Sequence, residues 1–386
     1  MAKLTLADIN QYSGTTINPL DNPGEVYELY SVPSFDSQCP EIIKGSEIGS
    51  SKITVEDGDV LVCKINPRIN RVWVVKHHTD HPLLASSEWI VVRNSKMDSN
   101  YLKWYFSSPT FRNLLVSQVA GIGGSLTRAQ PKQVAKYPVP IVDIYEQRRI
   151  AAVLDKVSGL IAKRREQLDK LDELVKARFV EMFGDPVLNP MKWPEKPLEN
   201  MADIVSGITK GRKTKETELI EVPYMAVSNV KDGYIDWTTV KTILATKAEI
   251  EQYRLLPDDV LMTEGGDPDK LGRGAIIQQP LENCIHQNHI FRVRLNENIL
   301  LPSYFAEFLQ HQKAKQYFLK CAKQTTGIAS INMRQLKGLP TLVPPLEIQV
   351  HFDDFVEKTG QSKLKIQQSL DKLEILKKAL MQQYFG

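Results

Sequence analysis

The sequence predicts an α+β protein in which two copies of one unit each join a globular domain to a long helix. Three observations support this fold class. The chain of 386 residues repeats itself once, with a period near 200 residues. Two long segments without proline carry apolar residues at heptad spacing. Short apolar runs separated by glycine, proline and asparagine precede each of these segments, as strands do.

Composition sets the limits for function. Hydrophobic residues make up 42% of the chain and charged residues 25%, which is typical of a globular protein and excludes wholesale disorder. The net charge of +3, from 49 basic and 46 acidic residues, neither indicates nor excludes a nucleic-acid partner, because charge can be local. No stretch approaches 18 apolar residues and the N-terminus lacks a signal peptide, so we expect no membrane association. The scattered cysteines, Cys39, Cys63, Cys284 and Cys321, lack Cys-x-x-Cys spacing and indicate reduced thiols in a cytoplasmic protein.

The repeat is clearest where each copy ends. Residues 168–171 have the same sequence as residues 370–373, and Phe183-Gly184 matches Phe385-Gly386. Weaker matches keep the same order: Asp59-Val60-Leu61 with Asp259-Val260-Leu261, Ile90–Arg93 with Phe291–Arg294, Pro138 with Pro340, and Gln147 with Gln349. The offset drifts, as loop insertions would produce. Four prolines in residues 185–197 predict an extended, non-helical connector between the copies.

Residues 146–183 and 348–385 are predicted to form the long helices. Apolar residues alternating by fours and threes form the seam expected of a coiled coil. The seam residues are Leu154, Ile161, Leu168, Leu171 and Val175 in the first helix and Phe352, Val356, Ile366, Leu370, Leu373 and Leu380 in the second. An ordinary helix hairpin packed on a core is the alternative to an antiparallel pair with a pseudo-two-fold axis. The predicted boundaries are 1–143 and 188–343 for the globular domains and 144–187 and 344–386 for the helical segments.

Each globular half is predicted to mix strands with a short helix that has an aromatic face. The predicted strands are Val60–Ile65, Val72–Lys76 and Trp89–Arg93 in the first half and Pro223–Val227, Gly274–Gln278 and Ile290–Arg294 in the second. The short helices are expected near Tyr101–Val116 and Pro302–Ala322.

Known catalytic motifs are missing from the sequence. There is no P-loop, no Gly-x-Ser-x-Gly and no Asn/Asp-Pro-Pro-Tyr tetrapeptide of an adenine-amino methyltransferase. Residues 121–124 lack the third glycine of a dinucleotide fingerprint, and residues 267–272 fail as a calcium loop. The histidines at 77, 78, 81, 286 and 289 do not have the spacing of a zinc site. We therefore expect neither catalysis nor a bound metal in this chain.

Basic loops occur in both halves. Residues 209–215 carry four cations and a glycine, and residues 64–71 mix cations with amide side chains. Arginine and asparagine can read base edges through paired hydrogen bonds, whereas lysine mostly neutralises phosphates. Any one cluster could be a solvated surface, but basic loops in both halves favour a nucleic-acid interface.

The ordered set of features resembles the specificity subunit family of type I restriction–modification systems. The resemblance lies in the duplication, in Glu146-Gln147-Arg148-Arg149-Ile150-Ala151 running to Phe183-Gly184-Asp185-Pro186, in Pro344-Pro345-Leu346-Glu347 before the second helix, and in Val222–Val230 and Leu261–Asp267. It covers essentially the whole chain.

This resemblance implies a non-catalytic subunit that recognises double-stranded DNA. Each target recognition domain would read one half of a bipartite site, while the paired helices set the distance between the halves and dock two modification subunits. Those subunits would bind S-adenosylmethionine and methylate adenine N6 after base flipping. Restriction subunits, joined through the modification subunits, would use ATP and Mg. No cofactor is expected in this chain.

The expected DNA contacts are spread over both domains. They are Lys64, Asn66, Arg68, Arg71 and Arg128 in the first and Lys210, Arg212, Lys213, Lys215, Lys270, Arg273 and Arg334 in the second. Arg128 and Arg334 are expected at comparable places before the two helices. Because Gly14–Pro19 stands where the second domain has Thr209–Lys215, the two halves are expected to read different sequences. The alternatives are a structural coiled-coil adaptor without nucleic-acid contact and an enzyme with an unrecognised site.

Overall fold

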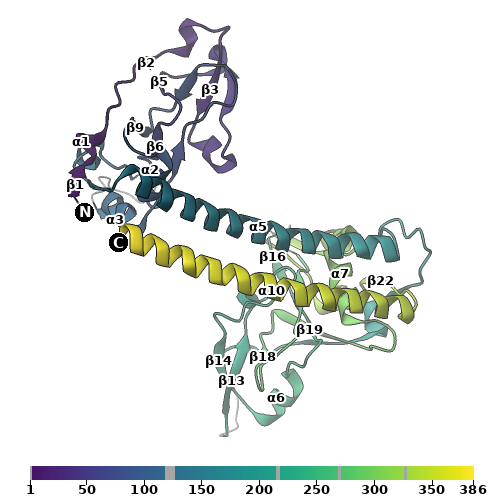
Figure 1. Ribbon diagram of the computed structural model, residues 1–386. Coiled ribbons are helices and arrows are strands. Elements are labelled where there is room, and N and C mark those ends of the chain that lie inside the picture. The colour runs from purple at the N-terminus through teal and green to yellow at the C-terminus, as the bar shows by residue number, and fades with distance from the viewer. Residues whose placement is uncertain (1, 118–126, 214–217, 268–270, 326–327) are drawn as a thin grey trace. The chain divides into compact units, whose positions relative to one another are not determined.

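Figure 1 shows a computed structural model of the chain, which describes residues 2–117, 127–213, 218–267, 271–325 and 328–386. The chain divides into two compact units. Unit 1 comprises Met1–Arg165 and Gln368–Gly386, and unit 2 comprises Glu166–Gln367. Each unit therefore contains one globular domain together with part of each long helix.

Unit 1 contains a three-stranded antiparallel sheet, a five-stranded sheet and a strand pair. The three-stranded sheet has the strand order β7 (Val72–Val74), β6 (Val60–Cys63), β9 (Trp89–Val92). The five-stranded sheet has the order β2 (Thr16–Ile17), β5 (Lys52–Thr54), β8 (Leu83–Ala85), β3 (Val26–Tyr30), β4 (Glu41–Lys44). The strand pair is β1 (Ala2–Thr5) with β10 (Pro138–Ile141). The short helices are α1 (Leu6–Ile9), α2 (Ser99–Phe106), α3 (Pro109–Ser117) and α4 (Pro131–Val134). All four residues of β6 are buried, which explains its continuous apolar sequence.

Unit 2 repeats this plan with different loops. A four-stranded sheet has the strand order β12 (Ala202–Ser206), β19 (Ile290–Leu295), β15 (Val260–Thr263), β17 (Gly274–Ile276). One three-stranded sheet has the order β14 (Lys241–Ala245), β13 (Ile220–Met225), β18 (Ile285–His286), and another has the order β16 (Gly265–Gly266), β21 (Ile328–Ser330), β20 (Lys323–Thr325). The strand pair is β11 (Glu195–Pro197) with β22 (Pro340–Leu342). The short helices are α6 (Lys247–Tyr253), α7 (Pro302–Gln310), α8 (Gln312–Cys321) and α9 (Met333–Lys337).

Strand pairing shows that the two domains are copies of one topology. The antiparallel trio β7-β6-β9 in unit 1 corresponds to β17-β15-β19 in unit 2. A parallel pair, β3 with β8, corresponds to β13 with β18. The pair β1–β10 corresponds to β11–β22.

Buried polar contacts repeat as well. Arg93 donates from Nε and a terminal nitrogen to the buried carboxylate of Asp59 at 2.7 and 2.8 Å, and Arg294 binds Asp259 in the same way at 2.8 Å for both bonds. These hydrogen bonds raise the pKa of each arginine. The Gln147 amide is buried, accepting from the Asp98 amide and donating to the Val142 carbonyl, and Gln349 makes the equivalent bonds in unit 2. The weak sequence matches thus fall on residues that hold each domain together.

The two predicted long helices are present and pack together. They are α5 (Ile144–Phe183) and α10 (Leu346–Phe385), each 40 residues long, and each begins two residues before its predicted start. The α+β fold class with paired long helices is therefore confirmed. Within unit 1 the first part of α5 packs with the last part of α10 through Leu154 and Phe385. Within unit 2 the last part of α5 packs with the first part of α10 through Phe179 and Phe352.

None of the expected seam residues is exposed. Leu154, Ile161, Phe352 and Leu370 are buried, and the remaining members of the set are partly buried. Ion pairs join the helices within each unit: Arg165 to Glu374 at 2.6 Å in unit 1 and Lys363 to Asp172 at 2.5 Å in unit 2. Lys363 lies seven residues after Val356 and seven before Leu370, which is a seam position, and its ammonium group binds a carboxylate on the other helix.

The prediction of one short helix in each half is wrong. Residues 101–116 form α2 and α3, separated at Ser107 and Ser108, because Pro109 begins a new helix. Residues 302–322 likewise form α7 and α8, separated at His311. In α2 and α7 the aromatic face is buried, as expected of helices that cover the sheet.

Candidate nucleic-acid interface

The basic segment 64–71 is the loop of the β6–β7 hairpin. Asn66 and Asn70 adopt positive φ values of 47° and 50°, a conformation that asparagine tolerates better than most residues. The amide of Asn66 donates to the Thr127 carbonyl at 2.9 Å, and the Ala129 amide donates to the Lys64 carbonyl at 2.8 Å. The loop is therefore tied to the chain segment that leads into α4.

The expected DNA contacts in unit 1 differ in their surroundings. Arg68 is exposed, and Arg71 is partly buried. Arg128 pairs with Glu88 at 3.0 Å, but half of its side chain remains exposed. A surface ion pair of this kind contributes little stability, so Arg128 stays available to an anionic ligand.

A polar pocket of about 280 Å³ opens beside the hairpin tip. Its lining combines Asn70 with Arg112 and Asn113 from α3. Arg112 and Asn113 are not among the residues expected from the sequence, because neither lies in a cationic run. The break at Pro109, which starts α3, is the one sequence feature that could have drawn attention to them.

The basic run in unit 2 leads into β13. Lys210 and Lys213 are exposed, and the structure gives neither an ion-pair partner among the residues it describes. Arg212 is different, because it donates from Nε to Glu249 Oε1 at 2.6 Å and from a terminal nitrogen to the other carboxylate oxygen. These bonds hold the pKa of the Glu249 carboxyl below its usual value, and Glu249 also caps α6 through Thr246. Arg212 is thus a poorer candidate for DNA contact than its two lysine neighbours.

The other expected contacts in unit 2 are Lys215, Lys270, Arg273 and Arg334. Arg273 directly precedes β17 and is partly buried. Lys270 and Lys215 lie outside the described residues. Arg334 is exposed on α9.

The expected correspondence of Arg128 with Arg334 is wrong. The Ala129 amide donates to the Lys64 carbonyl, and the Ile331 amide donates to the Glu264 carbonyl in the same way. Arg128 is therefore equivalent to Ser330, and Arg334 is equivalent to Lys132 in α4, four residues further along. Arg334 lies 206 residues after Arg128, whereas the offset of 202 residues that relates Pro138 to Pro340 and Gln147 to Gln349 also relates Ala129 to Ile331.

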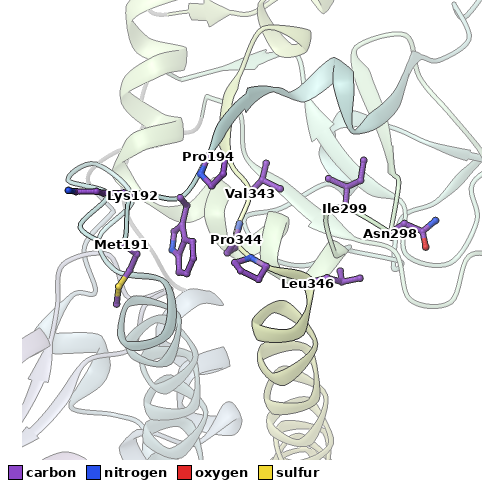
Figure 2. Close-up of a pocket in the computed structure, with 10 residues that line it drawn as sticks. Met191, Lys192, Pro194, Asn298, Ile299, Val343, Pro344 and Leu346 are labelled. Carbon is purple, nitrogen blue, oxygen red and sulfur yellow. The ribbon is translucent and has the colours of Figure 1, made fainter.

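Unit 2 also has an apolar groove where the connector after α5 meets the start of α10 (Figure 2). Its volume is about 530 Å³. The lining residues are Met191, Lys192, Trp193, Pro194, Asn298, Ile299, Val343, Pro344, Pro345 and Leu346. The Trp193 indole donates to the Phe183 carbonyl at 2.9 Å, which fixes the connector against the end of α5.

Neither a metal site nor a membrane span is found in the part of the chain that the structure describes. No cluster of histidine, cysteine, aspartate and glutamate there could hold a metal ion. No helix among those residues is long and apolar enough to cross a bilayer. The loop of His77 and His78 is held instead by Glu28, which is buried and accepts hydrogen bonds from the His78 amide and from Thr79.

Comparison with known proteins identifies the family. Residues 190–379 match the family model described as type I restriction modification DNA specificity domain. The chain is 22% identical over 272 residues to the type I restriction enzyme EcoKI specificity subunit of Escherichia coli K12, covering 67% of this chain and 58% of that protein. It is 27% identical over 197 residues to the putative MjaX specificity subunit of Methanocaldococcus jannaschii, covering 51% and 46%. The chain belongs to the specificity subunit family of type I restriction–modification systems.

Solved structures agree with this membership at the level of the fold. The S subunit of a type I restriction–modification system from M. genitalium aligns over 100% of this chain and 96% of its own, with a TM-score of 0.59 and 13% identity. A chain from a study of the assembly and conformational transition of the type I R-M system aligns over 100% and 97%, also with a TM-score of 0.59, at 17% identity. Specificity subunits form a non-catalytic family without a cofactor of its own.

Proposed function

We propose that this specificity subunit recognises a bipartite, asymmetric site on double-stranded DNA within a type I restriction–modification complex. The observation that carries the proposal is the repeated hairpin, β6–β7 in unit 1 and β15–β17 in unit 2, because each presents an arginine without an acidic partner among the described residues. Half of all protein–DNA hydrogen bonds or more go to phosphates and sugars, and arginine and lysine supply many of them. Two copies of one reading device support two half-sites.

Differences between the units support an asymmetric target. Unit 2 carries lysines in the segment before β13 and the helix α6 after β14. In unit 1 the described residues between β2 and β3 include no lysine, and β4 is followed by the short 3-10 helix Gly45–Glu47. The hairpin loops also differ in sequence, since residues 65–70 contain two asparagines and residues 265–272 contain three glycines. Loops that differ in shape and hydrogen-bonding groups read different base edges.

The proposed partners are two modification subunits, which carry S-adenosylmethionine, and restriction subunits that join through them and use ATP and Mg. Apolar side chains on the outer faces of the long helices support this docking. In unit 1 these are Leu160, Ile375 and Leu376, and in unit 2 they are Leu174 and Leu364, with exposed fractions from 40% to 70%. Such residues are typical of helix surfaces that are covered by another protein.

Methylome sequencing of cells that express the chain with its modification subunits tests the main proposal. We expect a methylated motif with two separated, non-identical halves, and a symmetric or continuous motif would contradict it. Gel-shift titration of the purified complex on that motif should then show affinity that falls steeply with salt. The absence of salt-sensitive binding would favour a structural adaptor, and methylation by the chain alone would favour an enzyme.

Lys213 offers a single-residue test. We expect Lys213→Ala to weaken binding to all duplexes and to lower the slope of log affinity against log salt by about one, because the lysine neutralises a phosphate. Lys196→Ala removes another exposed cation, from β11 of the same unit, and is the matched control. If the Lys213 variant keeps the wild-type slope, this residue does not contact DNA.

A further inference from the structure

One arginine occupies the same place in the hairpins of both units. The amide of Cys63 donates to the Arg71 carbonyl at 3.0 Å, and the amide of Thr263 donates to the Arg273 carbonyl at 3.1 Å. One residue further along, the Lys64 amide donates to the Glu88 carbonyl and the Glu264 amide donates to the His289 carbonyl. These carbonyl groups are equivalent, because Cys63 pairs with Trp89 and Thr263 pairs with Ile290. The backbone register is therefore the same, and Arg71 and Arg273 are structurally equivalent.

The surroundings of these two guanidinium groups are also alike. Among the described residues neither Arg71 nor Arg273 forms an ion pair, whereas Arg93 and Arg294 in the same domains bind buried aspartates. In both Arg71 and Arg273 the Nε atom is buried and finds no hydrogen-bond acceptor within the described part of the chain. A buried donor left without an acceptor destabilises the folded protein. That this state is present in both copies indicates that the acceptor comes from a ligand.

The residues before each arginine differ between the units. Residues 65–70 read Ile-Asn-Pro-Arg-Ile-Asn, and residues 265–272 read Gly-Gly-Asp-Pro-Asp-Lys-Leu-Gly. If the two domains read different half-sites, a group that is identical in chemistry and position does not carry the difference. It can serve what the two half-sites share, which is the phosphate backbone.

We propose that Arg71 and Arg273 are equivalent phosphate contacts, one for each half-site, that position the hairpins on DNA independently of sequence. The loop residues before them then read the bases. The guanidinium group suits this role because it binds two phosphate oxygens at once through parallel hydrogen bonds. This inference rests on the proposed function and divides the work within that interface.

The test uses the full chain in complex with its modification subunits and duplexes that carry the methylated motif or single changes in either half. Affinity is measured by fluorescence anisotropy between 50 and 200 mM salt. We expect Arg71→Ala and Arg273→Ala each to weaken every duplex by about 10- to 100-fold and to lower the salt slope by about one. The ratio of affinities for matched and altered duplexes should not change. Asn66→Ala should change that ratio for one half-site only.

Substitutions that separate charge from geometry complete the design. Arg71→Lys should keep the salt slope while losing part of the affinity, because lysine binds phosphate through one point charge. Lys96→Ala removes an exposed cation from the same unit, outside the hairpin, and should bind normally. If thermal unfolding shows that Arg71→Ala is not folded, Arg71→Gln replaces it, and we expect the same loss of affinity and of salt slope.

The outcomes separate this inference from the function on which it rests. If the wild-type complex does not bind DNA, the proposed function fails. If it binds and the arginine variants keep the wild-type affinity and salt slope, only this inference fails. It also fails if Arg71→Ala changes base preference in one half-site, because a phosphate contact is indifferent to sequence.

Discussion

Phe385 should stabilise the domain at the other end of the sequence. Its side chain is 5% exposed and packs in unit 1 against Tyr101 and Tyr105, with ring centroids at 5.5 and 5.8 Å. Removal of a buried phenylalanine costs about 3–5 kcal/mol, and we expect about 3 kcal/mol here because a helix end can relax. Phe385→Ala should therefore destabilise unit 1, although residues 1–165 are unchanged.

Amide hydrogen exchange of the full chain, followed by mass spectrometry, measures each unit separately. A loss of about 3 kcal/mol should accelerate exchange in β6, β9 and α2 about a hundred-fold, with little change in β15 and β19. Phe183→Ala should show the reverse, because Phe183 is buried in unit 2 against Tyr304 and Phe352.

Leu376→Ala is the control for this experiment. The side chain lies on the same helix but is 45% exposed, so we expect a change within about 0.5 kcal/mol. The reasoning would be refuted if Phe385→Ala left exchange in unit 1 unchanged, or if it accelerated exchange equally in both units.

Four further variants test other parts of the structure. Gly159→Ala and Gly360→Ala should each stabilise the chain by about 1 kcal/mol in thermal unfolding, because both glycines are exposed inside continuous helices and a Cβ would meet nothing within 4 Å; a lower midpoint would contradict this. Burial lowers the pKa of His286 to about 3. This pKa lies below the unfolded value of about 6.5, so stability is lost as pH falls below about 6.5, reaching about 2 kcal/mol at pH 5; denaturation of His286→Leu should lack this loss. Asp259→Asn should destabilise unit 2 by about 2–3 kcal/mol in denaturant titrations, since Arg294 loses its charged partner, and an unchanged midpoint would argue against a structural role for the pair.

The long helices could be predicted from sequence because heptad spacing is a local signal that extends over many turns. The seam residues Ile161 and Leu370 are buried, as their spacing implies, and the off-seam Leu376 is exposed. The break between α2 and α3 was missed because an aromatic pattern continues across Pro109.

The candidate interface was only partly accessible to sequence reasoning. Runs of cations located both hairpins and the segment before β13. They did not show that Arg212 has a partner in Glu249, since a contact over 37 residues depends on tertiary packing. The equivalence of Arg71 and Arg273 likewise emerged only from strand register, because the loops before them differ in length.

The last part of α10 belongs to unit 1 and the last part of α5 belongs to unit 2. This arrangement affects the order in which the two units can fold during synthesis of the chain. Unit 2 is contiguous in sequence, whereas unit 1 needs residues 368–386, which leave the ribosome after all of unit 2. The domain that is translated first is therefore completed last. Until then its hydrophobic core lacks Met381 and Phe385, and the nascent chain carries a finished second domain beside an unfinished first one.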